Sequence, residues 1–186
     1  MRTVIQGWSG FGFLARLAIA VLTGVTWAVC SVQQVLVQPD SWNPVSQADW
    51  FAVYSYSVAW LITAISLLIL REVARQAPGL STSIVVASAG SAVAGIGNLL
   101  EHGLSLKGFG AMYVTGVLVG GLGLFFVAAR VWVSPVRSLT FVAGIGGIAV
   151  ALVTVGGGVL GLVAWLGLGA ILTRERVRPT AAPSTA

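Results

Sequence analysis

The stretch Gly97–Gly116 reads GNLLEHGLSLKGFGAMYVTG and separates two long apolar runs. It carries Glu101 and His102, the only histidine of the chain, whereas the runs 82–100 and 109–129 contain no charged residue. Each run is close to the about 20 residues that a helix needs to cross about 30 Å of hydrocarbon. The stretch therefore predicts a helical hairpin whose connection lies at a membrane surface.

The composition of the whole chain also indicates an integral membrane protein. Charged residues make up 8% of the 186 residues, against roughly 25% in a typical soluble domain, and the mean hydropathy is +0.96. The net charge of +5 is spread over the ends of apolar segments instead of forming a basic patch, so we expect no nucleic-acid partner. With Cys30 as its only cysteine and a single histidine, the chain has no recognisable metal-ligand set, and we expect neither a metal nor a cofactor.

The number of spans depends on the run Leu139–Leu172, which has 34 residues without a charge. As one helix this run would be roughly 50 Å long at about 1.5 Å per residue, which is too long for one span. The glycine triplet at 156–158 supplies the backbone freedom for a tight turn near its middle. The six expected spans are 17–36, 50–70, 82–100, 109–129, 139–155 and 159–172.

The distribution of lysine and arginine favours this count. With six spans, nine arginines lie on one side and Lys107 alone lies on the other, whereas five spans would give six against four. Cytoplasmic loops of membrane proteins carry the excess of positive charge. We therefore predict an all-α bundle of three consecutive hairpins within a single transmembrane domain (1–178), with both termini cytoplasmic and a disordered tail at 179–186. The expected location is the bacterial cytoplasmic membrane.

Small residues recur at helical spacing along three of the expected spans, the last stripe beginning in the glycine triplet before the sixth span. In lipid, small residues four apart let helix backbones approach closely, so these stripes predict packing seams. Such seams join helices of one chain or hold a homo- or hetero-oligomer together. The stripes are Gly90, Ala94 and Gly97; Gly116, Gly120 and Gly123; and Gly157, Gly161 and Gly169.

Polar and aromatic residues converge on the side of the membrane opposite the arginines. Because side chains on one helix face recur at about 100° per residue, a polar-aromatic stripe of the second span is expected to face residues of the third and fourth spans. The predicted groove contains Asp49 and Glu101 as candidate catalytic acids, and Tyr56, Trp60, Asn98, His102 and Tyr113 as candidate substrate-binding residues.

The aromatic and charged residues at this side of the membrane also have a structural interpretation. An aromatic belt at the membrane interface is favoured for Trp42, Trp50 and Tyr54, whereas Tyr56 fits the belt and the groove equally. Trp60 lies deeper and would fill space between helices. Glu101 and His102 would then be a solvated helix end, although a carboxylate at a helix C-terminus is mildly unfavourable unless it has a specific partner.

Two classes of function follow, and the sequence does not decide whether the protein is an enzyme. The first is a membrane-embedded enzyme or binding protein for a lipid or isoprenoid-like apolar substrate, because an acid beside aromatic faces can protonate an alkene or epoxide and stabilise the cation. This chemistry is that of membrane-embedded terpene cyclases, but no motif of theirs is present. The second is an accessory subunit or scaffold of a membrane complex, since no acidic residue lies deep in a span. A transporter of a neutral substrate is a third alternative.

Overall fold

The computed structural model describes residues 10–40, 42–71, 78–132, 162–163 and 166. Within these ranges every regular element is helical. A short π-helical segment, η1, continues α3 without a break, and no strand occurs in this part of the chain. The elements are α1 (Gly10–Leu36), α2 (Gln47–Arg71), α3 (Pro78–Asn98), η1 (Leu99–Gly103) and α4 (Gly110–Trp132).

Four of the expected spans are confirmed as helices that are long and apolar enough to cross a membrane. The spanning segments are Leu17–Leu36, Gln47–Ile69, Gly79–Gly103 and Gly110–Val127. The expected spans 139–155 and 159–172, apart from three positions of the latter, lie outside the described residues, as does the tail 179–186. In its described part the protein is thus all-helical, and its four long apolar helices are consistent with a membrane protein.

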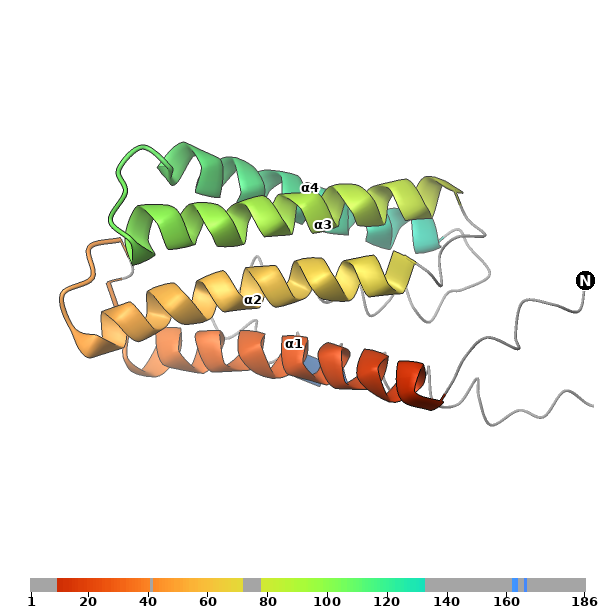
Figure 1. Ribbon diagram of the computed structural model, residues 1–186, viewed down its shortest axis with the longest axis horizontal. Helices are drawn as coiled ribbons and strands as arrows, with labels where there is room; N and C mark the ends of the chain where they lie inside the picture. Colours follow the sequence, from red (N-terminus) through yellow and green to blue (C-terminus); the bar gives the residue numbers. More distant parts are fainter. Residues whose placement is uncertain (1–9, 41, 72–77, 133–161, 164–165, 167–186) are drawn as a thin grey trace, which may run out of the picture.

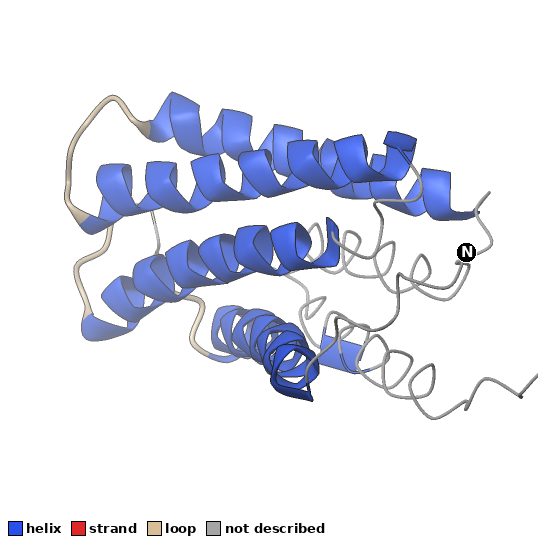
Figure 2. Cartoon of the chain, turned by 45° about the vertical axis from the view of Figure 1, so that its right-hand side comes forward, coloured by secondary structure: helices blue, strands red, loops and turns tan. Residues whose placement is uncertain are grey.

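The helices lie beside one another in chain order, with α2 next to α1, α3 next to α2 and α4 next to α3 (Figures 1 and 2). The connection 37–46 between α1 and α2 and the connection 104–109 between η1 and α4 lie at the same end of the bundle (Figure 1). We call this the acidic end, because Asp40, Asp49 and Glu101 all lie there.

Close backbone contact holds α3 against α4. A methyl group added at Gly97 would lie 2.5 Å from the backbone nitrogen of Tyr113, and one at Gly123 would lie 2.6 Å from the Cα of Ala87. The same approach joins Gly90 to Gly120 and Gly116 to Ala94. The stripes predicted on the third and fourth spans therefore pack against each other within one chain, as small residues allow in lipid. We call these contacts the glycine seam; the third stripe, at 157–169, lies outside the described residues.

Hydrogen bonds between side chains hold α1 against α2. The hydroxyls of Thr23 and Ser66 lie 2.6 Å apart, and the indole N–H of Trp27 donates to the hydroxyl of Thr63 at 2.8 Å. All four side chains are buried. Because hydrocarbon contains no water, buried polar side chains form hydrogen bonds with each other across the helix interface. The α1–α2 and α3–α4 interfaces therefore use different chemistry: hydrogen bonds between side chains for the first and close glycine contacts for the second.

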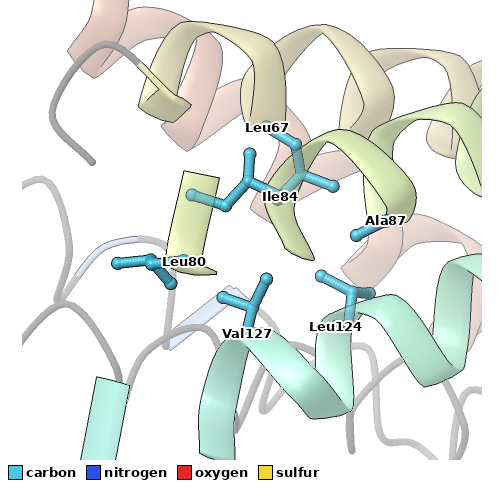
Figure 3. Packing of buried hydrophobic residues seen from close by; sticks show 6 residues of the cluster. All are labelled: Leu67, Leu80, Ile84, Ala87, Leu124 and Val127. Carbon is cyan, nitrogen blue, oxygen red and sulfur yellow. The ribbon is translucent and has the colours of Figure 1, made fainter. Parts of the chain in front are cut away.

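Two apolar clusters of described residues lie between the helices. One lies toward the end opposite the acidic end and combines residues of α2, α3 and α4, namely Leu67, Leu80, Ile84, Ala87, Leu124 and Val127 (Figure 3). The other draws on all four helices: it consists of Trp27, Cys30, Ala59, Trp60 and Ala94, with Tyr56, Tyr113 and Val117 packed against it.

Candidate functional site

Asp49 forms a capping box at the start of α2. The hydroxyl of Ser46 accepts the N–H of Asp49 at 3.2 Å, and Oδ2 of Asp49 accepts the N–H of Ser46 at 2.8 Å. This reciprocal pair satisfies backbone groups that a helix start leaves without partners. The carboxylate also accepts the N–H groups of Asp40, at 2.8 Å on Oδ1, and of Val45, at 3.2 Å on Oδ2. Both oxygens of Asp49 therefore hold the connection 37–46 in place.

Replacing Asp49 by Ala is expected to destabilise the acidic end. The substitution leaves the N–H groups of Asp40, Val45 and Ser46 without their acceptor, and an unpaired backbone donor is costly. We expect a lower unfolding temperature in detergent and faster amide hydrogen exchange in 37–46. Gln47→Ala, an exposed position in the same turn, is the matched control. A wild-type unfolding temperature and exchange rate for Asp49→Ala would contradict the capping role.

Glu101 has a specific partner, the N-terminus of α4. Its Oε2 accepts the N–H of Phe109 at 2.5 Å and the N–H of Gly110 at 2.8 Å. An anion is stabilised at a helix N-terminus because the backbone N–H groups there point outward and carry partial positive charge. A residue in the last turn of the third span therefore caps the helix that follows it.

The backbone around Glu101 departs from a regular α-helix. In η1 the N–H of Leu104 bonds to the carbonyl of Leu99, five residues back, at 2.8 Å. Ser105 then takes a left-handed conformation, with φ of 55°. Short π-helical turns shift the phase of all residues that follow them. The 100° spacing used to place Glu101 and His102 from the sequence therefore does not hold beyond Asn98.

Three aromatic rings meet at the acidic end. The rings of Trp42 and His102 lie edge to face, with centroids 5.2 Å apart, and Tyr113 lies 6.2 Å from each of them. We call Trp42, His102 and Tyr113 the ring cluster. Trp42 is 66% exposed, whereas the other two are half-buried. The imidazole of His102, the hydroxyl of Tyr113 and the indole N–H of Trp42 form no hydrogen bond with other described residues.

The deeper members of the predicted groove pack between helices. Asn98 is buried and donates from Nδ2 to the carbonyl of Val53 and to the hydroxyl of Ser57, at 2.9 Å each. Trp60 is 3% exposed and lies edge to face with Trp27 at 5.2 Å. These contacts tie α2 to α3 and to α1. Such buried, hydrogen-bonded positions favour a structural role for both residues.

Tyr56 also faces α1, where its hydroxyl donates to Oε1 of Gln34 at 3.2 Å. The predicted site residues thus fall into three groups: capping carboxylates (Asp49, Glu101), interhelical contacts (Tyr56, Trp60, Asn98) and members of the ring cluster (His102, Tyr113). Tyr113 links the last two groups, since it also packs against the cluster around Trp27.

The sequence predicts an interfacial belt position for Trp42 and no contact between α1 and the site. A signal for α1 was present, because Thr23, Trp27 and Gln34 recur at helical spacing and all bond to α2. No comparable signal existed for Trp42, which reaches His102 across 60 residues of sequence.

Within the described ranges no group of three His, Cys, Asp or Glu side chains could hold a metal ion. Comparison of the chain with protein-family models, with curated proteins and with solved structures gave no match.

Proposed function

We propose that the protein binds a lipid or isoprenoid-like amphiphile at its acidic end, with the ring cluster as the contact surface. The observation that carries the proposal is the meeting of Trp42, His102 and Tyr113 beside connections from both hairpins. Trp and Tyr rings are amphipathic and suit the boundary between headgroups and acyl chains. The exposed Trp42 offers an apolar face, and the donors of the three side chains are not used by other described residues and can bind a polar head.

The proposal is for a binding protein and does not include acid catalysis. Both oxygens of Asp49 and one oxygen of Glu101 already accept backbone N–H groups. Tyr56 and Trp60, which were expected to stabilise a cation, pack against Trp27 instead. An accessory subunit would use glycine stripes as contact surfaces for its partner, but the stripes of α3 and α4 already pack against each other.

The proposal includes the orientation of the protein in the membrane. Six spans, with both termini cytoplasmic in a bacterial membrane, place nine arginines on one side and the acidic end on the outside. The ring cluster would then meet the outer leaflet.

Trp42→Ala is expected to lower crosslinking of a lipid probe at the acidic end about tenfold, which corresponds to the free energy of one lost aromatic contact. The probes are a diacyl phospholipid and a polyprenyl phosphate, each with a photoactivatable group next to its head. Mass spectrometry of the labelled peptides should locate the adduct near residues 42, 102 or 113 in the wild type.

Trp50→Ala is the matched control for this experiment. Trp50 also lies near the acidic end, but it stacks on Tyr54 at 6.1 Å and forms no ring contact with the ring cluster. Equal labelling of Trp42→Ala, Trp50→Ala and the wild type, or no labelling by either probe, would refute the proposed function.

A further inference from the structure

The three acids of the acidic end use their oxygens differently. Asp49 employs both oxygens in backbone contacts. Asp40 accepts the N–H groups of Trp42 and Asn43 on Oδ1 alone, at 3.1 and 3.0 Å, and Glu101 accepts its two on Oε2 alone. Oδ2 of Asp40 and Oε1 of Glu101 therefore keep their acceptor sites with respect to the described residues.

These two carboxylates flank the ring cluster along the chain. Asp40 precedes Trp42 by two residues and fixes its backbone, while Glu101 adjoins His102 and caps α4 one turn before Tyr113. The ring cluster thus carries N–H and O–H donors, and its neighbours carry anionic acceptors. A ligand that satisfies both sets needs an acceptor-rich group and a cationic donor close together.

The charge of the acidic end further restricts the class of ligand that can bind there. Among the described residues of this end, the acids are Asp40, Asp49 and Glu101, and the only basic residues are Lys107 and His102. A headgroup with net negative charge meets repulsion there, because like charges in a medium of reduced dielectric disfavour each other. A zwitterionic headgroup adds no net charge and still offers a phosphate.

Resting on the proposed function, we propose that the ring cluster binds the headgroup of a phosphatidylethanolamine-like lipid. The donors of His102, Tyr113 and Trp42 contact the phosphate, while Asp40 and Glu101 accept hydrogen bonds from the primary ammonium. Charge-assisted hydrogen bonds of this kind are stronger than neutral ones, so the carboxylates set the preference for the headgroup. The acyl chains then lie along the apolar helix surface below.

The test is titration of phosphatidylethanolamine and of phosphatidylglycerol into the full-length protein in mild detergent, with native mass spectrometry as the readout. We expect the wild type to bind phosphatidylethanolamine about tenfold more tightly than phosphatidylglycerol. Tyr113→Phe removes a phosphate donor and should weaken both lipids by the same factor, about three- to tenfold. Asp40→Asn and Glu101→Gln keep an oxygen for the backbone N–H groups and should weaken phosphatidylethanolamine alone.

The outcomes separate the two proposals. Equal binding of both lipids by the wild type, or an unchanged preference in Asp40→Asn and Glu101→Gln, overturns the headgroup assignment. If Trp42→Ala still loses both lipids in that case, the proposed function stands. Both proposals fall if wild type and Trp42→Ala bind each lipid equally. Thermal unfolding of every variant shows that a loss of binding is not a loss of fold, and Asp40→Asn, exposed and able to keep its turn, is the least disruptive of them.

Discussion

Replacing Gly116 by Val is expected to push α4 away from α3 and to lower the free energy of unfolding by about 3 kcal/mol, the upper part of the range for overpacking. A Cβ at this position would collide with the backbone nitrogen and Cα of Ala94. Backbone atoms cannot rotate away as the tip of a flexible side chain can. The whole helix must shift, and the contacts of Gly120 and Gly123 are lost with it.

Gly121→Val is the matched control, because a Cβ at Gly121 meets nothing within 4 Å. Both substitutions add the same side chain to the same helix, so the change in helix propensity cancels in the comparison. Unfolding in mixed micelles with increasing dodecyl sulfate gives the two free energies. Similar values for Gly116→Val and Gly121→Val would contradict the close approach of α3 and α4.

Replacing Trp27 by Ala is expected to cost about 3–5 kcal/mol, the range for deletion of a buried aromatic side chain. Trp27 is 2% exposed and contacts Trp60 and Tyr56, with centroids 5.2 and 6.5 Å away. Its removal leaves a void where all four helices meet and takes the donor from Thr63. We expect α1 to separate from α2 before the remaining helices unfold.

Trp27→Phe divides this effect into packing and hydrogen bonding. It keeps most of the ring surface but removes the indole N–H that Thr63 accepts, so the expected cost is only about 1–2 kcal/mol. Trp42→Ala is the control for loss of a tryptophan at an exposed position. The same dodecyl sulfate titration gives all three values, and a Trp27→Ala cost equal to that of Trp42→Ala would show that α1 is not anchored through Trp27.

The α3–α4 interface can be predicted from the sequence, whereas the α1–α2 interface cannot. The glycine stripes of α3 and α4 recur at a fixed spacing, and close approach follows from the absence of side chains at those positions. The α1–α2 interface depends on single pairs such as Trp27 with Thr63. The sequence of either helix alone does not show which residue of the other helix it will contact.

The sequence by itself determined which four described segments form helices long and apolar enough to cross a membrane, and which faces of α3 and α4 carry the glycine seam. Both properties are local: hydrocarbon demands an apolar run of a given length, and a helix repeats its faces with a fixed period. The two C-terminal spans and the cytoplasmic termini remain predictions from charge and glycine placement.

Only the tertiary structure decided what the polar residues of the acidic end do. Asp49 and Glu101 were equivalent as candidate acids, yet Asp49 holds the connection before its own helix with both oxygens and Glu101 caps the next helix with one. The π-helical turn at Leu99–Gly103 shifts the phase of Glu101 and His102, and the connection 37–46 brings Trp42 to them. These contacts join segments far apart in the chain, so no periodicity within a single helix encodes them.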